Sequence, residues 1–103
     1  MDNNLEIDKM ITISTGHISK HTALALEREV KYCLNEIEIP LSIYIKAEFG
    51  WFIFIPDNSE FEEGRIPDDL TDCINFAKKH NCKWLCLDCD GLIMSELKTY
   101  DWN

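Results

Sequence analysis

The chain has 103 residues and a mass of 12.0 kDa, which suits one domain with one hydrophobic core. Hydrophobic residues make up 46% of the sequence and charged residues 28%, which excludes disordered and collagen-like proteins. Ten Lys and Arg residues against 19 Asp and Glu residues give a formal charge of −9. Because binding to a phosphate backbone requires clustered cations, we expect no direct contact with nucleic acid.

The sequence predicts a cytoplasmic protein that makes no contact with a membrane. No apolar run reaches the roughly 20 residues that cross a bilayer, and residues 1–6 are too polar for a secretory signal. The five cysteines are an odd number, and free thiols are their simplest interpretation in a reducing compartment.

Residues 1–9 are expected to form a flexible leader, because polar residues interrupt every apolar pattern there. Residues 10–103 then form a single α+β domain. Alternating Ile and hydroxyl residues predict a strand over residues 10–14. Apolar residues with a 3.6-residue period predict a helix over about residues 20–36, capped by Ser19 or Thr22.

A two-residue period predicts two antiparallel strands over residues 41–46 and 51–55, of which the second is apolar on both faces and therefore central. A second helix begins near Pro67 and ends before Asn81, which can supply a left-handed stop. A strand over residues 83–87 follows.

Asp90-Gly91 favours a tight hairpin turn, with residues 92–94 as a short return strand. Tyr100 and Trp102 are large aromatic residues that are unusual in a frayed terminus. We therefore expect the C-terminal segment to dock on the domain.

This order, β-α-β-β-α-β, predicts a two-layer, ferredoxin-like (split βαβ) sheet with two helices on one face and an extra C-terminal hairpin or tail. The other face must be covered by something else. In the central strand Phe52 and Phe54 point opposite to Trp51, Ile53 and Ile55. The pattern leaves open which side the helices cover: we expect the two Phe rings on the uncovered face, and the alternative places them in the core.

The neighbouring strands contribute one of two alternating sets to that face. The first neighbouring strand contributes either Tyr44 or the pair Ile43 and Ile45. The second contributes either Trp84 and Cys86 or Leu85 and Leu87. A homodimer, a partner protein or the segment with Trp102 could cover the exposed apolar patch.

Six short segments of the chain together form a familiar pattern: residues 13–18, 49–53, 66–70, 73–77, 82–91 and 100–102. This ensemble resembles a family of small uncharacterised proteins carried by bacterial plasmids, integrated elements and phages. The similarity covers nearly the whole chain from residue 11 onward. The resemblance implies a mobile-element setting and carries no assigned activity.

A candidate anion site lies between the first strand and the first helix, at Ser14, Thr15, Gly16 and His17. Backbone amides at such a position can hold an anion, and His17 could act as acid or base with Asp88 or Asp90. This is the alternative function, a small enzyme or nucleotide-binding domain. Roles in a loop and a helix cap explain the same residues.

The residues with metal-ligand chemistry gather between His80 and Asp90. Cys82 and Cys86 are too far apart on a strand for a zinc knuckle. Asp88 and Asp90 lack the further oxygen ligands of a calcium loop, because Leu92 occupies the next alternate position. We expect no metal and no cofactor.

Acidic residues concentrate between residues 57 and 72. This segment has seven Asp and Glu residues and one basic residue, Arg65, which gives it a net charge of −6. A solvated loop and a charged helix start account for them. The alternative is a surface for a basic partner. The members are Asp57, Glu60, Glu62, Glu63, Asp68, Asp69 and Asp72.

These observations favour a small, acidic, non-enzymatic interaction protein of a phage or mobile element. It would bind, and in one version inhibit, a host or element-encoded protein. A nucleic-acid-binding partner is one concrete version, because the acidic segment would imitate phosphate charge. No catalytic set of residues stands out, so an enzyme is the weaker hypothesis.

Overall fold

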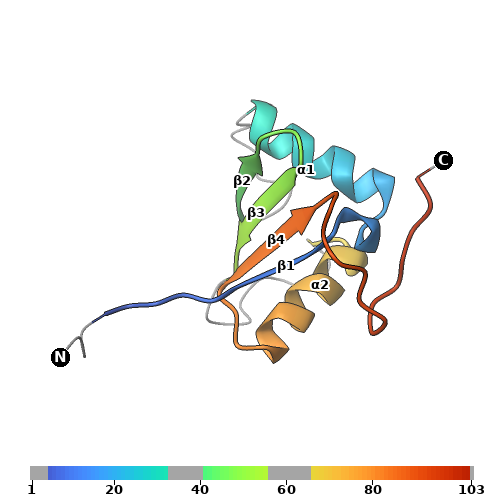
Figure 1. Ribbon diagram of the computed structural model, residues 1–103. Coiled ribbons are helices and arrows are strands. Elements are labelled where there is room, and N and C mark those ends of the chain that lie inside the picture. Colours follow the sequence, from blue (N-terminus) through green and yellow to red (C-terminus); the bar gives the residue numbers. More distant parts are fainter. Residues whose placement is uncertain (1–4, 33–40, 56–65, 103) are drawn as a thin grey trace.

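The computed structural model describes residues 5–32, 41–55 and 66–102. Along the chain it shows β1 (Met10–Ser14), the 3-10 turn η1 (Thr15–His17), α1 (Lys20–Tyr32), β2 (Ser42–Lys46), β3 (Gly50–Phe54), α2 (Asp68–Lys79) and β4 (Trp84–Asp88) (Figure 1). The α+β class and the predicted order of strands and helices are confirmed. The predicted end of the first helix at residue 36 lies outside the described residues.

The four strands form one mixed sheet in the order β1-β4-β3-β2. β1 runs parallel to β4, whereas β3 is antiparallel to both of its neighbours. The central position of β3 is confirmed. The ferredoxin-like topology is not confirmed, since β1 lies beside β4 in parallel. Element order alone leaves open which strands become neighbours.

Both helices pack on the same face of the sheet. The register aligns Ile13 with Leu87 and Leu85 with Ile53, and these side chains are fully buried. They share one apolar cluster with Leu26 of α1 and with residues of α2. In Figure 1 α1 lies toward β2 and α2 toward β4. The core is therefore the single layer between the helices and this face.

The buried carboxylate of Asp69 connects the beginnings of the two helices. Its Oδ2 accepts the Ser19 N–H at 2.6 Å and its Oδ1 accepts the Thr22 hydroxyl at 2.8 Å. Ser19 Oγ in turn accepts the Thr22 N–H at 3.2 Å and caps α1, which decides between the two predicted caps, Ser19 and Thr22. Asp69 is 8% exposed, so it stabilises the packing of α1 on α2.

The hairpin predicted at Asp90-Gly91 does not return along β4. Both edges of β4 are occupied, by β1 and by β3, so a return strand has no free edge to pair with. The chain instead crosses to the outer edge of β1, where the Ser14 N–H donates to the Leu92 carbonyl at 2.9 Å. The hairpin prediction was wrong because it treated β4 as an edge strand.

The C-terminal segment docks beside η1 and the start of α1, as expected (Figure 1). The Tyr100 N–H donates to the Gly16 carbonyl at 2.9 Å. The Trp102 indole Nε1–H donates to the Ile18 carbonyl at 2.8 Å. These bonds direct Trp102 toward η1 and away from the other face of the sheet.

The N-terminal segment joins the sheet at its last residues. The Lys9 carbonyl accepts the Lys83 N–H at 2.9 Å, and Asp8 pairs with the Lys83 ammonium at 3.6 Å. Residues 5–8 extend away from the domain (Figure 1). The flexibility proposed for residues 1–9 stays a prediction, and residues 1–4 lie outside the described part.

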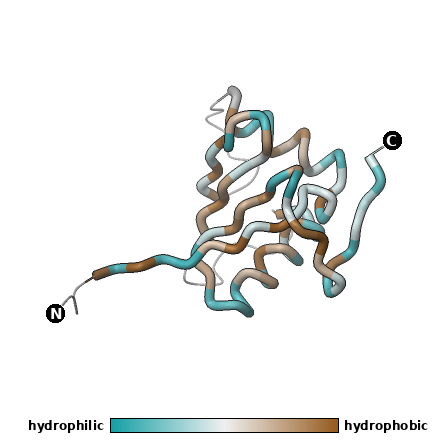
Figure 2. Tube along the Cα trace, viewed as in Figure 1, coloured by the Kyte–Doolittle hydropathy of each residue, from teal (hydrophilic) through white to brown (hydrophobic). Residues whose placement is uncertain are grey.

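Hydropathy follows this arrangement. Figure 2 shows apolar residues concentrated along the strands, whereas the turn after α2 is hydrophilic. Neither helix in the described ranges is long and apolar enough to cross a bilayer.

Gly50, the first residue of β3, allows β3 and β4 to approach closely. A Cβ atom at this position would lie 1.7 Å from the Leu87 carbonyl oxygen. We therefore expect Gly50→Ala to reduce the free energy of unfolding by about 2 kcal/mol or more. Thermal unfolding measures this loss as a melting temperature lower by about 8 °C or more.

Gly16→Ala is the matched control, because its Cβ would meet the Ser14 hydroxyl at 3.1 Å and a side chain can move where a backbone carbonyl cannot. Equal melting temperatures for the two variants would contradict this account of β3.

Candidate functional site

The face of the sheet opposite the helices is aromatic and partly exposed. We call it the open face, and it comprises Met10, Tyr44, Phe52, Phe54 and Trp84. The Trp84 ring centroid lies 5.2 Å from that of Phe54 and 6.0 Å from that of Tyr44. Tyr44 is 54% exposed and Met10 47% exposed. Phe52 and Phe54 therefore lie on the face that the helices do not cover, and their role in an interaction stays a prediction.

The structure decides between the alternatives for the neighbouring strands. Because Tyr44 is paired with Phe52, and Trp84 with Phe54, these rings share one face with the two Phe residues. Cys86 also belongs to this face but is fully buried. Sequence reasoning missed Met10. Alternation in β1 places it on the other face from Ile11 and Ile13, and the parallel pairing with β4 sets it beside Trp84.

A groove of about 350 Å³ crosses the open face. Its lining consists of Met10, Tyr44, Phe52 and Trp84. In the described part of the chain the C-terminal segment does not cover the groove, because Trp102 is bonded to Ile18 beside α1. Within residues 5–32, 41–55 and 66–102 the open face is therefore exposed to solvent at Met10 and Tyr44.

One ion pair borders the open face at the ends of β2 and β4. The Lys46 ammonium donates to Asp88 Oδ2 at 2.5 Å and lies 5.7 Å from the centroid of Phe52. Gly50 lies between Lys46 and Asp88 in the register. The hydrogen bond to Lys46 lowers the pKa of Asp88, and the same bond raises the pKa of Lys46.

Three groups with metal-ligand chemistry come together after β4. Ligand atoms of Asp88, Cys89 and Asp90 lie within 4.8 Å of one another, whereas His80 and Cys82 are not part of this group. Asp88 already binds the Lys46 ammonium through Oδ2 and the Asp90 N–H through Oδ1. Both carboxylate oxygens of Asp88 therefore already accept hydrogen bonds, and a cation would have to displace these donors.

His17 is 2% exposed, and both of its ring nitrogens are engaged by the backbone. Nε2 accepts the Met94 N–H at 2.8 Å, so Nδ1 carries the proton and donates to the Lys98 carbonyl at 2.8 Å. Neither bond involves Asp88 or Asp90, contrary to the acid-base arrangement considered above. His17 instead holds the C-terminal segment in place.

The anion site considered at Ser14, Thr15, Gly16 and His17 is also occupied by internal bonds. The Gly16 N–H donates to Ser14 Oγ at 2.9 Å. The Ser14 N–H donates to Leu92, and the Thr15 carbonyl accepts the Ile18 N–H at 3.2 Å. The geometry therefore supports the loop and cap roles.

The acidic residues do not form one described surface. Asp57, Glu60, Glu62 and Glu63 lie outside the described residues. Asp68 and Asp72 are exposed on α2. The expectation that Asp69 belongs to an interaction surface is wrong, because its carboxylate is buried between the helices.

The buried Cys73 thiol is poorly suited to act as a nucleophile. Cys73, Cys82, Cys86 and Cys89 are free, and Cys33 lies outside the described residues. Burial, and then the nearby carboxylates of Asp69 and Asp72, raises the pKa of the Cys73 thiol to about 12. Cys73 is therefore protonated at neutral pH, which opposes a catalytic role.

These features define a class of protein: a two-layer α+β domain with helices on one face of a mixed sheet and, on the other, an aromatic face that no described helix covers. The chain belongs to the family described as "Family of unknown function (DUF5983) C-terminal domain", and the match covers residues 10–102. Neither the curated proteins nor the solved structures contain a significant match to this chain.

The Lys46–Asp88 pair predicts a specific pH dependence of stability. Because the folded pKa of Asp88 lies below its ordinary 3.8, the carboxylate stabilises the fold above that value and loses its effect as the pH falls below it. The raised pKa of Lys46 means that its contribution disappears only above pH 10.5.

The test compares urea unfolding of the wild type and Asp88→Asn, which retains an acceptor for the Asp90 N–H. Their stability difference should be constant from about pH 5 to pH 9 and shrink below about pH 4. A difference that persists at low pH would show that the ion pair is not its source.

Proposed function

We propose that this chain is a small acidic interaction domain, without enzymatic activity, that binds a basic protein through the open face. The observation that carries the proposal is the groove of about 350 Å³ between Met10, Tyr44, Phe52 and Trp84. Protein interfaces are enriched in aromatic residues and Met, and Trp and Tyr dominate their binding energy. An exposed set of this composition suits a contact surface better than it suits solvent.

Two arguments favour a basic partner. The chain carries a formal charge of −9, which attracts a cationic protein and opposes the approach of a second copy. Aromatic rings also attract Arg and Lys side chains. The Lys46 ammonium, 5.7 Å from the Phe52 centroid, is an example within this same face. A homodimer is the competing occupant.

The resemblance to proteins of plasmids, integrated elements and phages extends the proposal. In that setting the protein would act in the cytoplasm, and its partner would be a host protein or one encoded by the same element. A nucleic-acid-binding protein is a suitable target, because its cationic surface would be attracted to this chain. Binding there would inhibit the target by competing with nucleic acid.

The alternative, a small enzyme or anion-binding domain at Gly16 and His17, gains less support. Both nitrogens of His17 are used by Met94 and Lys98. The Gly16 N–H is used by Ser14. A reaction at this position would require the C-terminal segment to detach first.

The test uses a partner isolated with the tagged chain from its natural host and then purified. Phe52→Ser with Phe54→Ser should raise the Kd of the complex about tenfold or more, because both substitutions remove apolar contact area. The Kd should also rise with salt concentration. Calorimetry measures both effects.

Leu24→Ser is the matched control, because Leu24 is an apolar residue of α1 that is 50% exposed and does not belong to the open face. It should leave the Kd unchanged. The far-ultraviolet circular dichroism of each variant reports whether it remains folded.

Two outcomes would contradict the proposal. One is a Kd that the double substitution does not change. The other is a wild-type dimer in light scattering that becomes a monomer on the double substitution, which would assign the open face to a second copy.

A further inference from the structure

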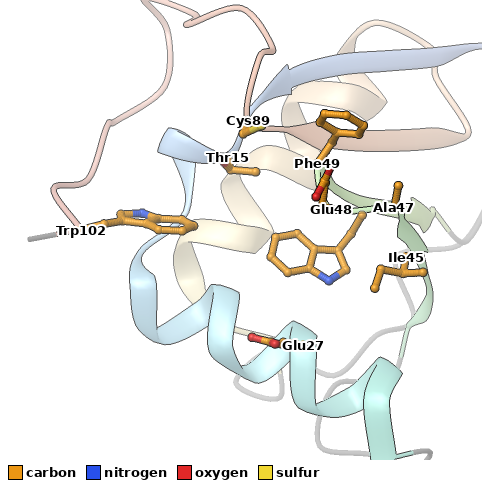
Figure 3. A pocket seen from close by; sticks show the side chains of 10 residues that line it. Thr15, Glu27, Ile45, Ala47, Glu48, Phe49, Cys89 and Trp102 are labelled. Atoms are coloured by element: carbon orange, nitrogen blue, oxygen red, sulfur yellow. The ribbon is translucent and has the colours of Figure 1, made fainter.

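A second cavity, of about 380 Å³, lies at the end of the sheet between α1, the β2–β3 turn and the C-terminal segment (Figure 3). It is separate from the open face, because its central residue Trp51 lies on the helix-facing side of β3 together with Ile53. Exposed residues such as Glu27, Ala47 and Glu48 form much of its lining, so solvent reaches it.

Three aromatic residues contribute to this cavity from two parts of the chain: Phe49 and Trp51 at the β2–β3 turn and the start of β3, and Trp102 in the C-terminal segment. Trp51 also packs against the apolar core, which limits its movement. Trp102 is held by the bond from its indole Nε1–H to the Ile18 carbonyl at 2.8 Å. Figure 3 shows the Trp102 indole ring and, lower in the view, the side chain of Glu27 on α1. Both indole rings are therefore positioned before any ligand arrives.

The polar groups of the cavity favour positive charge. Glu27 and Glu48 contribute carboxylates, and Thr15 and Cys89 contribute neutral polar groups. Among the described residues that line the cavity there is no Lys, Arg or His. An anion would be repelled here, whereas a cation would be attracted by two carboxylates and could contact the aromatic rings that line the cavity.

We infer that this cavity binds an organic cation whose head group is a quaternary ammonium. Such a group cannot donate hydrogen bonds, so aromatic faces and carboxylates recognise it better than uncharged hydrogen-bond acceptors do. A volume of about 380 Å³ is within the range of small-molecule sites. The site goes beyond the proposed function, since neither its residues nor its ligand involve the open face.

The test titrates choline into the ¹⁵N-labelled chain and follows the three indole N–H signals by NMR. Trp51 and Trp102 should shift, whereas Trp84, on the open face, should not. The neutral isostere 3,3-dimethylbutan-1-ol has the same shape without the charge, and it should bind about three- to tenfold more weakly.

Glu27→Gln tests the electrostatic part without changing the size of the side chain. It should weaken choline binding about two- to fivefold. Glu6→Gln is the matched control, because it changes the net charge equally but lies in the exposed N-terminal segment. It should leave the affinity unchanged. The dispersion of the amide signals shows whether each variant is folded.

A further arm distinguishes two sources of the same head group. A short peptide with trimethyllysine is compared with the unmodified peptide and with choline. Tighter binding of the methylated peptide would assign the site to a protein side chain, and tighter binding of choline to a free metabolite. The inference is overturned if choline and its neutral isostere bind equally, or if about 10 mM choline leaves the Trp51 and Trp102 signals unchanged.

Discussion

Two helices packed on a four-stranded sheet can cover only one of its faces, and the rest of this structure depends on that constraint. The face made by Ile13, Ile53 and Leu85 receives both helices and forms the core. The opposite face is therefore left with the rings of Tyr44, Phe52 and Trp84. A domain of this size has no further helix in its described part to place over them. The exposed apolar surface follows from the architecture, and its aromatic composition makes it suitable for binding.

The buried polar residues join distant segments of the fold, and the candidate binding surfaces are therefore made by other residues. His17 and Asp69 attract attention in the sequence, but each is buried and uses its polar atoms to join distant segments. Among the described residues every buried side-chain nitrogen or oxygen has a partner. Buried polar groups without partners cost free energy, so these residues are constrained by stability. The open face and the cavity of Trp51 present side chains that are not used in this way.

The two candidate surfaces differ in the chemistry that they present. The open face is an apolar patch bordered by the neutralised Lys46–Asp88 pair, and it suits an extended contact with a protein. The cavity combines indole rings with carboxylates and suits a small cationic group. Both are compatible with the charge of −9, which draws cations toward the whole molecule. The buried His17 also contributes to the cavity. Its bond to the Lys98 carbonyl helps to fix the C-terminal segment, and that segment carries Trp102 to the cavity.

The sequence by itself determined the local elements of this protein. Residue periodicity located β1 at residues 10–14, and local chemistry limited the cap of α1 to Ser19 or Thr22 and identified the left-handed Asn81, whose φ is 61°. These features depend on near neighbours in the chain. Tertiary structure alone decided that β4 lies between β1 and β3, and that Trp84 instead of Leu85 faces outward. It also decided that His17 binds the backbone of Lys98 and that Trp51 and Trp102 line one cavity. Such contacts join residues far apart in the chain, and no local period or turn preference specifies them.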